Sequence, residues 1–166
     1  MPADRIDYRA AIYAGIAAGM VATVAQVVLW VVFTDALPAI FFRDSRFAAA
    51  IVMGRAVLPP PSSFDGRVML IATVVHFALA VGYGLILARL IARRRTASSL
   101  LAGAAFGLGL YALNMYGFTI VFPWFASSRD WITAATHAVF GSTAAGVYRV
   151  AAARRPASAP TLNGSH

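Results

Sequence analysis

Four strongly polar side chains interrupt stretches of the chain that are otherwise almost entirely apolar: Gln26, His76, Asn114 and His137. The two histidines stand in "TVVHFALAVGYG" (73–84) and "TAATHAVFGSTAAGVY" (133–148). An imidazole can titrate near neutral pH, ligate a metal or haem, or take part in hydrogen bonds. Which of these roles is open depends on the solvent around the two stretches.

The composition places these stretches in lipid. The chain is 60% hydrophobic and 12% charged, whereas a typical globular protein is about 25% charged. Its arginines fall in short clusters between apolar blocks, which is typical of membrane topology and not of a nucleic-acid-binding face. We therefore expect the lipid bilayer, and no nucleic acid, as the partner. The absence of cysteine excludes disulfides and thiol catalysis.

The chain has four blocks that satisfy the requirement of about 20 largely apolar residues for a spanning helix: 10–34, 68–88, 99–122 and 131–148. The sequence therefore predicts an all-α membrane protein with four transmembrane helices in one domain, 1–155. Residues 156–166 have the composition of a flexible tail.

The connector 35–67 is long for a structureless loop. Its segment 44–58 has a helical composition, and "PPPSS" (59–63) ends that segment. We expect an interfacial or re-entrant helix here, with three arginines at the lipid headgroups: Arg43, Arg46 and Arg55.

The arginines also predict the orientation. The N-terminus, the second connector and the tail share one side of the membrane and carry nine of the fourteen, and the other side carries five. Cytoplasmic segments carry the excess of basic residues. Both termini are therefore predicted to be cytoplasmic.

A weak internal sequence repeat indicates a duplicated helix pair. The first block carries "GIAAG" (15–19) and ends in "FTDALP" (33–38), and the third carries "GAAFG" (103–107) and ends in "FTIVFP" (118–123). A histidine-bearing block follows each of them. Chance similarity in a chain rich in alanine and glycine is the alternative. In either case the GxxxG pairs favour close helix crossings.

Depth brings the polar side chains together. Counted from the non-cytoplasmic ends of their helices, all four lie roughly 9–12 Å into the membrane at 1.5 Å per residue. Lipid offers no hydrogen-bond partner there, so Gln26, His76, Asn114 and His137 are predicted to face inward as one polar layer. Four neighbours are candidates to complete the network: Thr23, Thr73, Tyr111 and Thr136.

Three interpretations of the layer stay open. The first is interhelical hydrogen bonding that stabilises the bundle, which needs no cofactor. The second is ligation of a b-type haem by His76 and His137. The third is a proton, metal or quinone site in which the two histidines titrate.

The second half of the chain resembles the YagU-like small bacterial inner-membrane proteins. The resemblance covers about 75 residues and lies in four segments: "HFALAVGY" (76–83), "LLAGAAFGLGLY" (100–111), "FPWF" (122–125) and "THAVFGSTAAGVYR" (136–149). It implies a location in the bacterial inner membrane and a role in acid resistance, and His137 is the layer residue that matches the family pattern.

No catalytic-triad, zinc-binding or phosphate-loop pattern appears, so we expect neither enzyme activity nor a resident metal. We predict a small accessory or structural membrane subunit, or a stress-related membrane protein, that associates with its own copies or with other membrane subunits. The alternative is a haem-binding redox protein or an ion- or proton-handling protein that uses His76 and His137.

Overall fold

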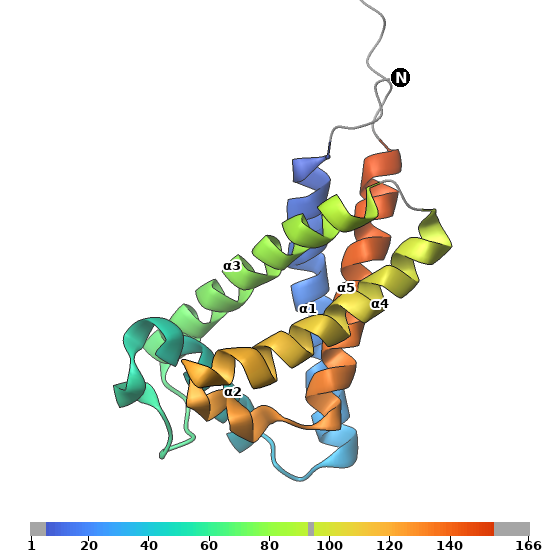
Figure 1. Cartoon of the computed structure of the whole chain (residues 1–166). Helices are drawn as coiled ribbons and strands as arrows, with labels where there is room; N and C mark the ends of the chain where they lie inside the picture. Colours follow the sequence, from blue (N-terminus) through green and yellow to red (C-terminus); the bar gives the residue numbers. More distant parts are fainter. Residues whose placement is uncertain (1–5, 93–94, 155–166) are drawn as a thin grey trace, which may run out of the picture.

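The computed structural model describes residues 6–92 and 95–154, and within these ranges the chain is helical and contains no strand. Its five α-helices are α1 (Tyr8–Phe33), α2 (Ala39–Met53), α3 (Gly66–Ile91), α4 (Thr96–Ala112) and α5 (Trp131–Ala153) (Figure 1). Four short helical segments join or extend them: η1 (Arg55–Val57), η2 (Leu113–Gly117), η3 (Phe118–Ile120) and η4 (Pro123–Ser128). The predicted tail 156–166 lies outside the described residues.

Aspartate begins three of the long helices. The carboxylates of Asp7, Asp65 and Asp130 accept backbone N–H groups in the first turns of α1, α3 and α5. The first N–H groups of a helix have no partner within it, so a carboxylate at this position stabilises the helix start. Half of the six aspartates of the chain are used in this way.

Three helical stretches are long and apolar enough to cross a membrane: α1, α3 and the continuous run Thr96–Ile120. The fourth predicted span, α5, has 23 residues, but Thr133, Thr136 and His137 lower its hydropathy. The fold is thus an all-helical membrane-type fold with three such stretches.

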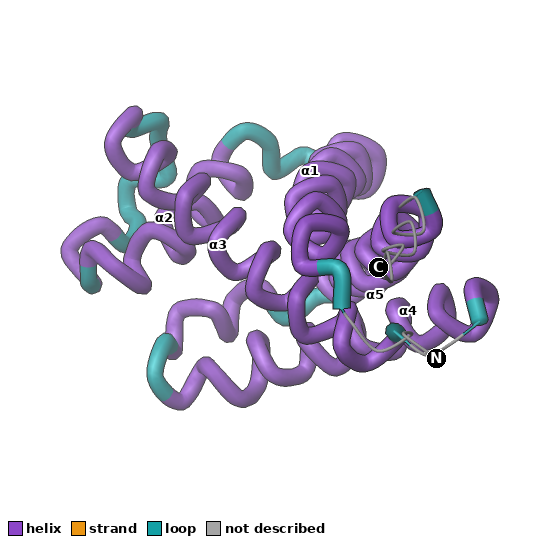
Figure 2. The backbone as a smooth tube through the Cα atoms, turned by 90° about the horizontal axis from the view of Figure 1, so that it is seen from above, coloured by secondary structure: helices purple, strands orange, loops and turns teal. Residues whose placement is uncertain are grey.

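The helices alternate in direction along the bundle. Helices α1 and α5 run steeply side by side, while α3 and α4 slant across them (Figure 1). Seen from above, α1 is nearly end-on, with α2 and α3 to one side of it and α5 to the other (Figure 2). We call the end where α1 begins and α5 finishes the terminal end, and the opposite end, which carries α2 and η4, the connector end.

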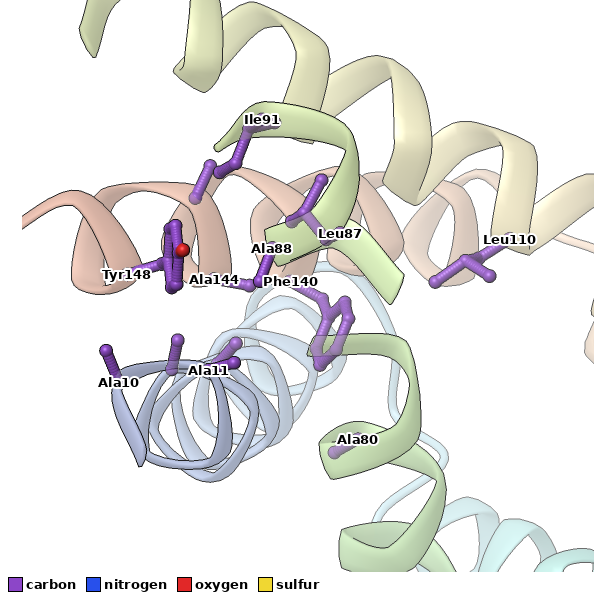
Figure 3. Packing of buried hydrophobic residues seen from close by; sticks show 13 residues of the cluster. Ala10, Ala11, Ala80, Leu87, Ala88, Ile91, Leu110, Phe140, Ala144 and Tyr148 are labelled. Atoms are coloured by element: carbon purple, nitrogen blue, oxygen red, sulfur yellow. The ribbon is translucent and has the colours of Figure 1, made fainter. Parts of the chain in front are cut away.

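Small residues form the core toward the terminal end. Alanines of α1 and α5 pack there with a few larger side chains, among them Leu87, Ile91 and Tyr148 (Figure 3). Hydrocarbon provides no hydrophobic force between helices, so membrane bundles gain stability from close packing of small residues. The core has the composition that this mode of packing requires.

Glycines mark the closest helix crossings. A Cβ added at Gly15 would lie 2.6 Å from the Ala80 carbonyl oxygen, so α1 rests directly on α3. A Cβ at Gly107 would collide with the His137 carbonyl, so α4 rests directly on α5. Each GxxxG segment therefore packs against the histidine-bearing helix that follows it.

The long connector is ordered, but its helix differs from the predicted one. Helix α2 begins at Ala39, not at residue 44, and it packs on α3 through Ala49 against Val68 and Ala72. Arg46 was expected at the headgroups, yet it is only 8% exposed. Its guanidinium donates to the carbonyl oxygens of Val57 and Ser63 and thereby folds the rest of the connector back onto α2.

Large apolar side chains cover the outer faces of the bundle. Val24, Leu70, Leu101 and Ile120 are all more than 60% exposed. Exposed apolar area on this scale is expensive in water and ordinary in lipid. The outside of the bundle is therefore compatible with contact to a bilayer.

Candidate functional site

A cavity of about 320 Å³ lies within the bundle toward its connector end. All five α-helices contribute to its wall, and η3 and η4 complete it. Most of the wall is apolar. The polar side chains that line it are Thr23, Gln26, Asp44, His76, Tyr83, Asn114, Ser128, Thr133, Thr136 and His137.

The structure places all four residues of the predicted polar layer on this wall: Gln26 from α1, His76 from α3, Asn114 from η2 and His137 from α5. Of their predicted neighbours, Thr23 and Thr136 also line the cavity. Thr73 does not, because it is exposed and bonded to its own helix at the Met69 carbonyl. Tyr111 lies outside the wall, with its ring edge-on to His137 at 5.8 Å.

Three helices are joined by one chain of hydrogen bonds. The Tyr83 hydroxyl donates to Oδ1 of Asn114 at 3.0 Å, and Nδ2 of Asn114 lies 3.3 Å from Nε2 of His137. Nδ1 of His137 lies 2.8 Å from the Thr133 carbonyl oxygen. A carbonyl oxygen only accepts, so Nδ1 carries the proton and Nε2 accepts from Asn114. The chain therefore fixes the His137 tautomer.

His76 is held by α1. Its Nε2 lies 3.4 Å from the Gly19 carbonyl oxygen and 3.3 Å from the Thr23 hydroxyl oxygen. The Thr23 hydroxyl itself donates to the Gly19 carbonyl at 2.9 Å, so Nε2–H of His76 is the donor to both oxygens. The two histidines share a cavity but belong to separate hydrogen-bonded groups.

Thr133, a residue of the cavity wall, has a hydroxyl without a hydrogen-bond partner in the described part of the chain. Its side chain is 4% exposed. A buried hydroxyl without a partner destabilises a protein by about 1–3 kcal/mol. Its oxygen is itself inaccessible to water, so the unsatisfied hydroxyl lies behind the surface of the cavity.

Asp44 is a carboxylate on the cavity wall that the sequence analysis did not assign to the site. Nε of Arg43 donates to its Oδ1 at 2.8 Å, and the Ser128 hydroxyl donates to the same oxygen at 3.3 Å. Burial raises the pKa of Asp44 above its ordinary value, although Arg43 acts in the opposite direction. The sequence carries no clear signal for this role, because Asp44 stands in the charged stretch "RDSR" (43–46).

Contacts between α2 and η4 close the connector end. Nε1 of Trp124 donates to the Phe47 carbonyl oxygen at 3.1 Å. The rings of Phe47 and Phe125 meet edge to face at 6.0 Å. The "FPWF" segment thus attaches the region after α4 to the connector helix.

Asn114 occupies a π-helical turn. In η2 the backbone of α4 widens over Leu113–Gly117, and such turns occur frequently at functional sites. Nε of Arg129 donates to the Met115 carbonyl oxygen at 2.6 Å and holds the turn from the next segment. The turn aims the Asn114 amide at both Tyr83 and His137.

The hydrogen bonds of the two histidines compete with the haem ligation that was considered as an alternative. Axial ligation needs one free ring nitrogen from each histidine aimed at a common iron. In each histidine Nε2 already bonds to a helical neighbour, Gly19 and Thr23 for His76 and Asn114 for His137. The geometry favours hydrogen bonding over ligation.

Comparisons with protein-family models, with curated proteins and with solved structures find no match to this chain.

Proposed function

We propose that the chain is a small accessory protein of the bacterial inner membrane that holds a small, largely apolar molecule in the cavity of its bundle. The observation that carries the proposal is the cavity itself, whose mainly apolar wall bears polar side chains from α1, α2, α3, α5, η2 and η4. A mainly apolar pocket with a few convergent polar groups is the usual form of a small-molecule site.

The hydrogen bonds across the wall support a second role for the same residues. His76 joins α3 to α1, Asn114 joins η2 to α5, and Tyr83 joins α3 to η2. The layer thus connects the helices as the first interpretation expected, and it also leaves space between them. The stress-related role implied by the YagU-like resemblance and association with other membrane subunits are compatible with such a ligand-holding protein.

In this proposal α5 is the fourth span, and both termini face the cytoplasm. Its polar residues Thr133, Thr136 and His137 line the cavity and do not face lipid, so its lower hydropathy does not prevent it from spanning. Reporter fusions after residue 97 and at the C-terminus should read cytoplasmic, and a fusion near Ser62 should read exported. An exported C-terminus would refute the four-span topology.

Cavity binding is tested with a fluorinated probe in lipid nanodiscs. We expect 4-fluorobenzyl alcohol to give a saturable bound resonance in ¹⁹F NMR spectra of the wild-type protein. Ala48→Phe places a ring in the cavity and should abolish that resonance, because Ala48 lines the wall. Ala39→Phe changes an exposed residue of the same helix and is the matched control. A resonance that survives Ala48→Phe would show partition into lipid and contradict the proposal.

A further inference from the structure

We propose that the ligand of this cavity is a small hydrophobic organic cation, with its ammonium group at Asp44 and its apolar body among the aromatic rings of the wall. This inference rests on the proposed function and names the chemical class of its ligand. Three features of the wall support it: the charge of Asp44, the position of its free oxygen and the distribution of aromatic rings.

The first feature is the charge on the wall. Asp44 is the one carboxylate among the described residues that line the cavity, and no arginine lines it. The Arg43 side chain bonds to Asp44 but is not part of the wall. A ligand inside the cavity therefore meets a carboxylate and no fixed positive charge, which excludes anionic ligands and favours cationic ones.

The second feature is the oxygen that Asp44 leaves free. Both of its side-chain hydrogen bonds, from Arg43 and from Ser128, end on Oδ1. Oδ2 has no hydrogen-bond partner within the described residues. Because Asp44 lines the cavity, a cation in the cavity can bind its carboxylate while Arg43 remains on Oδ1.

The third feature is the aromatic content of the wall. Three phenylalanines after α4 line the cavity: Phe118 from η3, Phe122 from the connection to η4 and Phe125 from η4. Tyr83 and Phe140 line it from α3 and α5. The faces of aromatic rings attract cations, and the attraction strengthens where water is excluded. Phe125 stands three residues before Ser128, the hydroxyl that bonds Asp44, so the rings and the carboxylate belong to one end of the cavity.

The electrostatics of Asp44 agree with this assignment. Burial raises the pKa of the Asp44 carboxyl even with Arg43 beside it, and Asp130 acts in the same direction. The contacts with Arg43 and Ser128 therefore do not fully offset the desolvation of the Asp44 carboxylate, and a bound cation would stabilise its charged form. The other titratable groups that face the cavity are Tyr83, His76 and His137, and any positive charge on the histidines would oppose the cation.

The experiment compares two probes of the same shape in nanodiscs: 4-fluorobenzyltrimethylammonium and its neutral isostere, 1-fluoro-4-neopentylbenzene. The ammonium probe carries a permanent charge, so its own protonation cannot change. We expect the Ala48→Phe-sensitive site of the wild type to bind the cation at least about tenfold more tightly than the isostere. Asp44→Asn should remove this preference, and Asp35→Asn, at an exposed carboxylate of the same connector, should keep it.

A second variant covers the case in which Asp44→Asn does not fold. Phe125→Leu keeps the wall apolar but removes a ring, so it should weaken the cation severalfold and leave the isostere unchanged. Equal affinity for the two probes in the wild type, or a preference that survives Asp44→Asn, overturns the cation assignment while the cavity proposal stands. If neither probe shows binding that Ala48→Phe blocks, the cavity proposal fails as well.

Discussion

Nδ2 of Asn114 and Nε2 of His137 lie 3.3 Å apart and join the π-helical turn after α4 to the first turns of α5. The contact has one direction, since Nδ1 of His137 is committed to the Thr133 carbonyl at 2.8 Å. Oδ1 of Asn114 faces the Tyr83 hydroxyl. The hydrogen bonds therefore run in one direction, from Tyr83 to Asn114 and from Asn114 to His137, and this direction can be tested by experiment.

The first prediction concerns the tautomer of His137. In the neutral ring the proton should reside on Nδ1, which ¹⁵N NMR of labelled histidine distinguishes from a proton on Nε2. Asn114→Leu removes the donor to Nε2 and should therefore shift the Nε2 resonance. The Thr133 carbonyl should still keep the proton on Nδ1, and the His76 signal, held by α1, should not change. A protonated Nε2 in the neutral wild-type ring would contradict the proposed direction.

The second prediction concerns the unpartnered hydroxyl. Thr133→Val replaces it with a methyl group of similar shape, and without ligand this should raise the free energy of unfolding by about 1 kcal/mol. Thr136→Val is the matched control and should lower it, because the Thr136 hydroxyl donates to the Thr133 carbonyl at 3.1 Å. Thermal unfolding in detergent measures both. Destabilisation by Thr133→Val would mean that the hydroxyl has a partner.

The third prediction concerns the crossing of α4 and α5. Gly107→Ala forces a Cβ against the His137 carbonyl and should lower the free energy of unfolding by about 1–3 kcal/mol. Gly109, two residues further along α4, has no heavy atom within 4 Å of the position of an added Cβ. Gly109→Ala should therefore be neutral or slightly stabilising. Equal effects of the two substitutions would contradict the close crossing.

The fourth prediction concerns Arg46. The two terminal nitrogens of its guanidinium donate to the Val57 and Ser63 carbonyls. A lysine at this position has a single ammonium group, which cannot reach both carbonyls in the same geometry. We expect Arg46→Lys to lower the free energy of unfolding by about 1.5–3 kcal/mol and to expose residues 54–65 to protease. Arg55→Lys, at an exposed position of the same connector, should change neither measurement.

The fifth prediction concerns pH. The pKa of Asp44 is raised in the folded state above its ordinary value of 3.8. The protonated carboxyl therefore favours folding, and this contribution is complete below the ordinary pKa and is lost as pH rises through the raised one. The difference between the melting temperatures of the wild type and of Asp44→Asn should therefore fall as pH rises from the ordinary pKa through the raised one. A flat difference would indicate that Arg43 fully compensates the carboxylate.

The helix positions were largely predictable from the sequence, because helix length and hydropathy are set by the thickness of the bilayer. The predicted span 68–88 lies within α3, and the span 131–148 begins with α5 at Trp131. The convergence of Gln26, His76, Asn114 and His137 on one wall followed from their common depth. Gly15 packs on α3 and Gly103 packs on α5 at corresponding positions of the two GxxxG segments, and the duplication stays a prediction.

The contribution of α2 to the site was not predictable in the same way. Hydropathy indicated a surface helix, so Arg46 was assigned to the lipid headgroups and Asp44 was given no role. In the structure each side chain has a hydrogen-bond partner within the protein, the Ser128 hydroxyl for Asp44 and the Val57 carbonyl for Arg46. These partners lie 84 and 11 residues away in the chain, and neither periodicity nor composition encodes such pairings.

The polar face of α5 has a consequence for biogenesis. A helix that carries Thr133, Thr136 and His137 gains less from entering lipid than α1 or α3 does, since insertion energies add residue by residue. Its hydrogen-bond partner Asn114 and its packing partner Gly107 belong to segments synthesised before it. We therefore expect α5 to leave the translocon by packing directly against helices that are already in the membrane. Its insertion should then depend on correct assembly of the preceding helices.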